Sequence, residues 1–135
     1  MPALYPSWIE IPVTDFDRAL HFYRTVFDLS ETPIYDEPSG KIAVLLPSEK
    51  SMRGPGISLI KSPLHKPTDG GPVVNFHMDT HHALTTALRH VARLGGVMDT
   101  ELVDMGDGVH YINILDSEGN RIALSSYEPL SDSDL

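Results

Sequence analysis

The sequence predicts an α+β fold built from two consecutive modules, each with the element order βαβββ. An alternating apolar stretch runs directly into a helical pattern at residues 8–27, and the same succession returns at residues 73–94. Corresponding apolar residues lie 65 positions apart, as Val13 does from Met78 and Ile57 from Ile122. A constant offset of this kind indicates an internal duplication.

The first module follows from its periodicities. Residues 8–13 alternate as a strand does, and Asp15 or Thr14 is placed to cap the helix that follows. An extended segment after Leu29, a turn at residues 35–40, a strand at 41–46, a loop at 47–56 and a strand at 57–60 complete the module. The helix is predicted from one apolar stripe, formed by Phe16, Ala19, Leu20, Tyr23, Val26 and Phe27.

The second module repeats this order, with a strand at residues 73–78 and a helix capped by Asp79. Gly95 and Gly96 end that helix, and turns at 106–108 and 116–120 separate extended segments at 97–105, 109–115 and 121–126. The helix stripe is Ala83, Leu84, Ala87, Leu88, Val91 and Leu94. The Ala-Leu pairs of the two helices lie only 64 residues apart, which predicts a one-residue slip before the second helix.

Length and composition narrow the class of protein. We expect a single domain over residues 1–135, with module 1 at about 7–62, module 2 at about 72–127 and a Pro- and Gly-rich connector at 63–71. The lack of cysteine excludes disulfides and thiolate metal sites, and a net charge of −9 argues against nucleic acid as a partner. Without a long apolar run or a secretory signal we expect no membrane contact and a cytoplasmic location. Residues 131–135, which include two aspartates, are predicted to form a solvent-exposed tail.

The strand faces differ in character. One face of each sheet must be covered by its helix and should be apolar, and the sequence supplies Ile9, Ile11, Val13, Ile57, Leu59, Val74, Phe76, Met78, Ile112, Ile114, Ile122 and Leu124. The opposite faces carry Trp8, Glu10, Ser58, Asn75, His77, Tyr111, Asn113, Ala123 and Ser125. This second set either faces water or lines a pocket. Trp8 and Tyr111 favour a pocket, because exposing both would leave large apolar surfaces in water.

Three stretches carry a resemblance to a known family. They are residues 11–19 with Phe22, Tyr23, Val26 and Phe27, then Gly95-Gly96, and the turn at 116–122, which resembles a D-x-[DE]-G-x-x-[IL] motif. The chain resembles the vicinal oxygen chelate superfamily, which includes glyoxalase I, bleomycin-resistance proteins, fosfomycin-resistance proteins and extradiol dioxygenases. The resemblance implies curved, mixed sheets around a central cavity, a small organic ligand between the two modules, and a homodimer.

The same resemblance bears on metal binding. Metal-using members hold a divalent ion with His and Glu side chains at four positions, which in this sequence are Trp8, Ser58, Val73 and Ala123. None of these is a His or a carboxylate, so we predict no cofactor and no metal at the usual site. A displaced divalent metal site built on Glu10 and His77 is the alternative, with Asn75 as a further oxygen donor.

We therefore expect a small-molecule-binding protein whose ligand contacts Trp8, Glu10, Ser58, Asn75, His77, Tyr111 and Asn113. An alternative is a lyase, isomerase or dioxygenase that uses a divalent metal or a general base, with Glu10 and His77 as catalytic candidates. A third is a structural domain without a pocket. Five other histidines are not predicted to form a metal site. His21 and His90 fall on helix surfaces, His65 lies in the connector, and the adjacent pair His81-His82 does not share one helix face.

Overall fold

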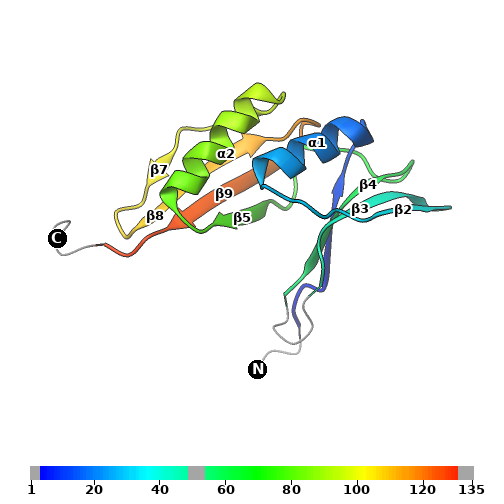
Figure 1. The fold of residues 1–135 in the computed structure, drawn as a ribbon, viewed down its shortest axis with the longest axis horizontal. Helices are drawn as coiled ribbons and strands as arrows, with labels where there is room; N and C mark the ends of the chain where they lie inside the picture. The colour runs from blue at the N-terminus through cyan, green and yellow to red at the C-terminus, as the bar shows by residue number, and fades with distance from the viewer. Residues whose placement is uncertain (1–3, 49–53, 131–135) are drawn as a thin grey trace. The chain divides into compact units, whose positions relative to one another are not determined.

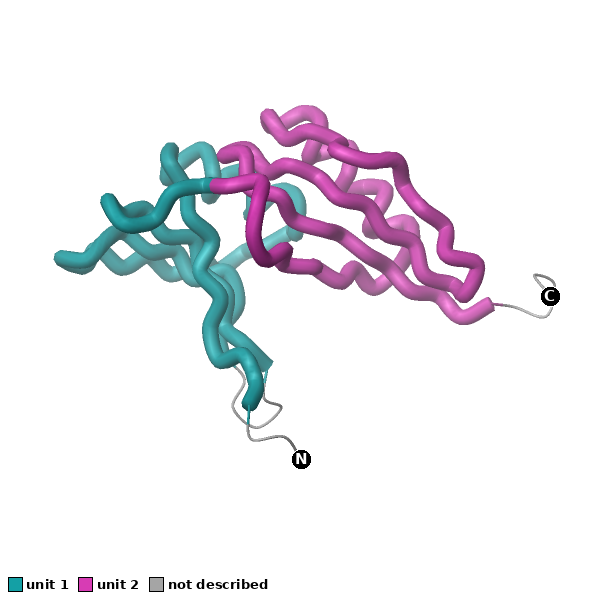
Figure 2. Tube along the Cα trace, turned by 180° about the vertical axis from the view of Figure 1, so that it is seen from behind, with its two compact units in different colours: residues 1–67 teal, residues 68–135 magenta. Residues whose placement is uncertain are grey.

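The computed structural model describes residues 4–48 and 54–130, and the predicted solvent-exposed tail at 131–135 lies outside them. The chain divides into two compact units, residues 1–67 and 68–135, which are coloured separately in Figure 2 and described here one at a time. The boundary falls within the predicted connector. Neither helix in the described part of the chain is long and apolar enough to cross a membrane.

Unit 1 is a four-stranded mixed sheet with one helix, in the order β1 (Trp8–Pro12), α1 (Phe16–Val26), β2 (Ile34–Glu37), β3 (Gly40–Leu46) and β4 (Gly56–Lys61). The strands lie in the spatial order β1-β4-β3-β2, with β1 and β4 parallel and the other neighbours antiparallel. Helix α1 begins where the Asp15 side chain accepts the N–H of Arg18 at 3.1 Å, as predicted. The helix packs on β3 and β4. The sheet residues Ile11, Val13, Ala43 and Leu59 are all buried.

Unit 2 contains β5 (Val74–Met78), α2 (His81–Arg93), β6 (Val97–Met98), β7 (Val103–Asp104), β8 (Val109–Leu115) and β9 (Arg121–Tyr127). Its sheet runs β5-β9-β8-β6, and the additional short strand β7 also pairs with β8. Figure 1 shows α2 lying along the sheet that contains β5, β8 and β9. The predicted α+β class with two helices and two mixed sheets is therefore confirmed, while the second module has one more strand than βαβββ allows.

The start of α2 corrects a prediction. The N-cap is Thr80, whose side chain accepts the N–H of Ala83 at 3.0 Å, and not Asp79. Thr80 has the extended backbone that a cap requires, with φ −136° and ψ 159°. The end of the helix agrees with the sequence, because Gly95 has φ +93° and the N–H of Gly96 binds the carbonyl of Val91 at 2.9 Å.

The duplication is visible in strand register. Ile9 pairs with Ile57 across β1 and β4, and Val74 pairs with Ile122 across β5 and β9, so both parallel pairs join residues 48 apart. The helices obey the same 65-residue offset as the strands, and the predicted slip is wrong. The slip was predicted by aligning the Ala-Leu pair of one helix with that of the other. Equivalent buried positions of the two helices in fact hold side chains of different size, so identical residue types do not mark equivalent positions. The corresponding helix positions are the caps Asp15 and Thr80 and the buried pairs Ala19 and Leu84, Phe22 and Ala87, and Val26 and Val91.

The turn before β9 is built around a buried carboxylate. Asp116 is 1% exposed, and its Oδ1 accepts the N–H groups of Glu118 and Asn120 at 2.8 and 2.9 Å. Its Oδ2 accepts Nδ2 of Asn120 at 3.0 Å. Gly119 adopts φ +92°, a conformation that favours glycine, and so closes the turn. This network explains why the sequence motif begins with an acid and contains a glycine, and Asn120 adds a further hydrogen bond to the same carboxylate.

Candidate functional site

Trp8 lies flat on β4 on the face opposite α1. Its Nε1 donates a hydrogen bond to Oγ of Ser58 at 3.1 Å, and its six-membered ring occupies the space that a Cβ on Gly56 would need. Gly56 is the residue paired with Trp8 in the parallel ladder. Ser58 is completely buried, whereas Trp8 keeps 43% of its surface exposed. The indole is therefore held in place along one edge and presents an open aromatic surface.

Glu10 follows on the same strand face, because alternate residues of a strand point the same way. Its Oε1 lies 3.9 Å from Nε2 of His65, and both side chains are partly exposed. Oγ of Ser62 lies 2.6 Å from Nδ1 of His65 and accepts the N–H of Leu64 at 3.1 Å. The Ser62 hydroxyl therefore bonds both Leu64 and His65, and Nε2 is the ring nitrogen on the side of Glu10. His65, assigned to the connector by sequence, is thus the histidine beside Glu10.

The corresponding face of unit 2 is polar. Asn75 and His77 on β5 lie beside Ala123 and Ser125 on β9, and Oγ of Ser125 donates to Oδ1 of Asn75 at 3.0 Å. Tyr111 pairs with Ser125 and Asn113 pairs with Ala123 from the other side. The sheet therefore places Asn75, His77, Tyr111 and Asn113 on one face, as the alternation predicts.

Arg121 also belongs to this face, and the sequence interpretation missed it. It precedes Ala123 by two residues on β9, and its Nη2 lies 2.7 Å from Oδ2 of Asp99. Strand alternation alone would have placed it among the face residues.

The seven predicted ligand contacts divide between the units. Trp8, Glu10 and Ser58 share a face of unit 1, although Ser58 is covered by Trp8 and positions the indole. Asn75, His77, Tyr111 and Asn113 share a face of unit 2. Their joint contact with one ligand stays a prediction.

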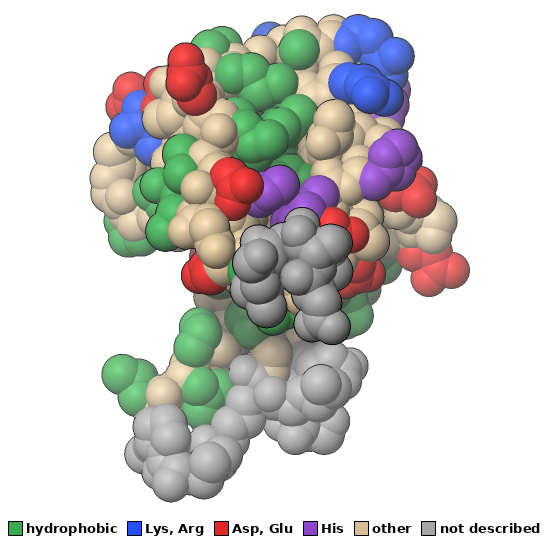
Figure 3. Space-filling model, turned by 90° about the vertical axis from the view of Figure 1, so that its left-hand side faces the viewer, with side chains coloured by type: hydrophobic (Ala, Val, Ile, Leu, Met, Phe, Trp, Pro, Cys, Tyr) green, Lys and Arg blue, Asp and Glu red, His purple; other side chains and the backbone are tan. Residues whose placement is uncertain are grey.

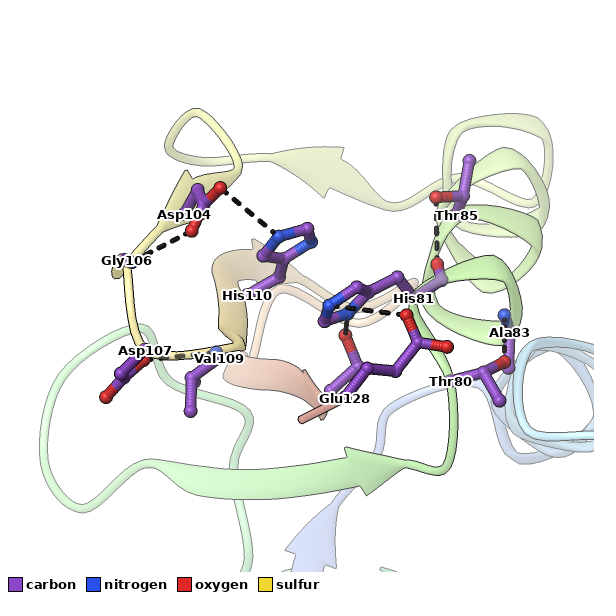
Figure 4. Close-up of polar contacts among 11 residues, drawn as sticks. Thr80, His81, Ala83, Thr85, Asp104, Gly106, Asp107, Val109, His110 and Glu128 are labelled. Carbon is purple, nitrogen blue, oxygen red and sulfur yellow. Dashed lines mark hydrogen bonds and ion pairs between the residues drawn. The ribbon is translucent and has the colours of Figure 1, made fainter. Parts of the chain in front are cut away.

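A second polar cluster lies on the helix side of the unit 2 sheet (Figure 4). The rings of His81 and His110 stack with centroids 3.6 Å apart and planes 11° apart. Nδ1 of His81 lies 2.7 Å from Oγ of buried Ser126, and its Nε2 lies 3.4 Å from Oε2 of Glu128. Nε2 of His110 lies 3.6 Å from Oδ2 of Asp104. Figure 3 shows histidine side chains gathered beside acidic ones on the face in view.

The residues at the four expected metal-ligand positions, Trp8, Ser58, Val73 and Ala123, do not form a set of side chains suited to a metal ion. The indole Nε1 of Trp8 has a hydrogen and no free lone pair, and Ser58 already accepts that hydrogen. Val73 and Ala123 carry no donor atom at all. Elsewhere in residues 4–48 and 54–130, no group of three or more His, Asp or Glu side chains is arranged to hold a metal ion.

Comparisons with known proteins agree with this fold. A structure of a glyoxalase/bleomycin resistance protein from Albidiferax ferrireducens T118 is similar with a TM-score of 0.69 and 14% identity, over 90% of this chain and 98% of that one. The fosfomycin resistance protein FosX from Listeria monocytogenes, complexed with Mn(II) and sulfate ion, gives a TM-score of 0.60 and 14% identity over 95% of each chain. A mutant of glyoxalase I from Zea mays gives 0.65 and 16%, over 88% of this chain and 46% of that one.

At these identities the structural likeness concerns the fold alone. No match was found among curated protein sequences. The sequence does match the model of the Glyoxalase/Bleomycin resistance protein/Dioxygenase superfamily over residues 6–124, which include both βαβββ-type units almost completely. The chain belongs to this superfamily.

Proposed function

We propose that this protein binds a small organic molecule without the four-ligand metal site of its metal-using relatives. One observation carries the proposal: Trp8 and Ser58, at two of the four metal-ligand positions, bind each other at 3.1 Å. An indole held in this way is a surface on which an apolar or aromatic ligand stacks. A FosX structure of similar fold is complexed with Mn(II). In this chain the side chains of Trp8, Val73 and Ala123 have no lone pair for a metal ion, and the hydroxyl of Ser58 is bonded to Trp8.

The proposal assigns ligand contacts to the sheet faces opposite the helices. In unit 1 the exposed indole of Trp8 supplies apolar contact and Glu10 supplies a carboxylate. In unit 2 Asn75, His77, Tyr111 and Asn113 supply hydrogen-bond donors and acceptors. An apolar surface with a few polar groups is typical of small-molecule sites.

Fluorescence tests this proposal directly, because Trp8 is the only tryptophan of the chain. A fragment library of aromatic and aliphatic compounds is titrated while Trp8 emission is recorded. For each compound that binds, we expect Glu10→Ala and Tyr111→Ala to weaken the affinity by about tenfold, the usual scale for a lost charged or aromatic contact. Asp17→Ala, which removes an exposed acid from α1, is the matched control and should leave the affinity unchanged. Equal affinities for all three variants would place the ligand elsewhere.

Elemental analysis tests the lack of a metal. Protein purified without chelator should contain less than about a tenth of an equivalent of Ni, Zn, Fe or Mn, since a real structural or catalytic site retains its ion. A stoichiometric metal content, removed by Glu10→Ala or His77→Ala, would instead support the displaced site.

A second candidate function is that of a metal-independent lyase or isomerase with Glu10 as general base. The neighbouring His65, at 3.9 Å and held by Ser62, favours it, because a base oriented by a second group is a common catalytic arrangement. His77 stays the other catalytic candidate. Glu10→Gln separates the two functions. A protein that only binds its ligand has no turnover to begin with, whereas an enzyme should lose its turnover in this variant and retain the fold.

We further propose a homodimer located in the cytoplasm. A sedimentation experiment tests the oligomer, since a monomer at high protein concentration would contradict it. Localisation of a tagged chain in cells tests the compartment.

A further inference from the structure

We propose that a hollow at the carboxyl ends of β1 and β4 binds a small organic anion, a carboxylate or a phosphate ester. This hollow adjoins the unit 1 sheet face at His65, which lies 3.9 Å from Glu10, but its two lysines are not among the ligand contacts assigned above. The parallel ladder ends where the N–H of Val13 binds the carbonyl of Ile60 at 2.9 Å, and beyond that point the two segments diverge. The space at the ends of parallel strands is a common place for ligands. It measures about 490 Å³ and is lined by Val13, Thr14, Lys61, Ser62, Pro63, His65, Lys66 and Pro67.

The charge of this hollow is opposite to that of the whole protein. The chain has a net charge of −9 and only 10 lysines and arginines, yet Lys61 and Lys66 both border this space. None of the described residues that line it is acidic. His65 of this lining lies 3.9 Å from Glu10, and the two lysines supply the positive charge for an anion. Ammonium groups bind carboxylates and phosphates through charge-assisted hydrogen bonds.

An adjoining hollow of about 450 Å³ shares Thr14 and Lys61 and adds Lys41. It is less suited to an anion, because Asp15 and Asp17 also line it. Nζ of Lys41 is occupied over the ring of Phe16, 4.6 Å from the ring centroid. We therefore assign the anion to the first hollow.

The remaining lining favours an organic ligand over a simple ion. Val13, Pro63 and Pro67 contribute apolar surface, on which the body of a ligand can rest. The turn that carries His65 is fixed, because its N–H binds the carbonyl of Ser62 at 3.2 Å and its Nδ1 lies 2.6 Å from the Ser62 hydroxyl. The wall on this side is therefore preformed.

The duplication shows how this end has diverged. The residue 65 positions after Lys61 is Ser126, which is buried and bonded to His81. By the same offset His81 corresponds to Phe16, which is buried and lines the adjoining hollow, so the two modules carry different side chains at this end of their sheets.

Titration of ¹⁵N-labelled protein with phenyl phosphate and benzoate tests the proposal, with benzyl alcohol as the uncharged probe and inorganic phosphate as the probe without an apolar body. We expect saturable amide shifts at Thr14, Lys61, His65 and Lys66 with at least one of the two organic anions. Whichever of them saturates identifies the preferred head group. Benzyl alcohol and inorganic phosphate should bind at least about tenfold more weakly, a difference of about 1.4 kcal/mol. Trp8 emission should not change, because Trp8 lies at the other end of β1, about 17 Å away by strand rise.

The double variant Lys61→Gln/Lys66→Gln should lose about tenfold or more in affinity for the saturating anion. The matched control Arg89→Gln/Arg93→Gln removes the same charge from exposed positions on α2 that do not line the hollow, and it should stay within about twofold. Equal losses in both double variants would overturn the site, and so would an absence of saturable shifts. A Trp8 response to the anion with these four amides unmoved would overturn it as well, while leaving the proposed sheet-face ligand site intact.

Discussion

Nε1 of Trp8 donates to Oγ of Ser58 at 3.1 Å, so the side chain of the first residue of β1 is bonded to the neighbouring strand β4. Ser58 is fully buried and Trp8 is nearly half exposed. The serine is therefore covered by the indole that it positions. This relationship leads to the first two predictions.

Ser58→Ala should lower the free energy of unfolding by about 1 kcal/mol, the typical net contribution of one hydrogen bond. It should also change the emission of Trp8, since Nε1–H loses its fixed partner. Urea denaturation followed by fluorescence measures both effects. Ser48→Ala is the control in the same unit, because it deletes a hydroxyl whose hydrogen bond to the carbonyl of Gly54 is longer, at 3.5 Å, and it should cost less. An unchanged Trp8 spectrum in Ser58→Ala would contradict the hydrogen bond.

Gly56→Ala should displace the indole, because the new Cβ would overlap the ring of Trp8. We expect a loss of about 1–3 kcal/mol in unfolding free energy, the range for inserting a methyl group into a packed contact. The effect should nearly vanish in a Trp8→Ala background, where the methyl group has room. A double-mutant cycle measured by circular dichroism checks this coupling. A similar loss in both backgrounds would show that strand geometry, and not the ring, requires glycine.

Asp116→Ala should be the most destabilising of the single changes proposed here. It removes a buried carboxylate that accepts hydrogen bonds from the N–H of Glu118 and from both the N–H and the side-chain amide of Asn120. Hydrogen bonds to charged groups contribute about 1.5–3 kcal/mol each, so we expect a loss of about 3 kcal/mol or more.

Chemical denaturation measures this loss, with two variants for comparison. Asp116→Asn keeps the Oδ1 acceptor and should fall between Asp116→Ala and the natural protein. Asp69→Ala, which truncates an exposed acid of the same unit, should be nearly neutral. A neutral Asp116→Ala would mean that the turn does not depend on this carboxylate.

The sequence was sufficient for the fold because its signals are local and repeated. Strand alternation, the Asp15 cap and the Gly95 helix end are each decided within a few residues, and the 65-residue offset relates the two modules. The α2 cap was misplaced because Asp79 and Thr80 both suit that role by type, and only the backbone of Thr80 distinguishes them.

The polar clusters depend on contacts that no local pattern reports. His81 and His110 are distant in sequence and meet only because α2 packs on a sheet that includes β8. The composition of residues 47–56 predicts a loop that includes Gly56. Its role beside Trp8 follows only from the register of the parallel strands β1 and β4. The contact of His65 with Glu10 could not be predicted from the sequence either, since it depends on the turn that begins at Ser62.

The stacked pair of His81 and His110 gives the last prediction. Their rings lie 3.6 Å apart at 11°, and each has a carboxylate near its Nε2, from Glu128 and Asp104 respectively. Stacked rings contribute about 0.5–1.5 kcal/mol beyond the area they bury, so a cycle of His81→Ala, His110→Ala and the double variant should show coupling of that size. Hydrogen exchange of unit 2 amides measures it, because Trp8 reports on unit 1. The control cycle pairs His110→Ala with His82→Ala, the exposed neighbour on α2. If both cycles gave the same coupling energy, the contact between the rings would make no contribution to stability.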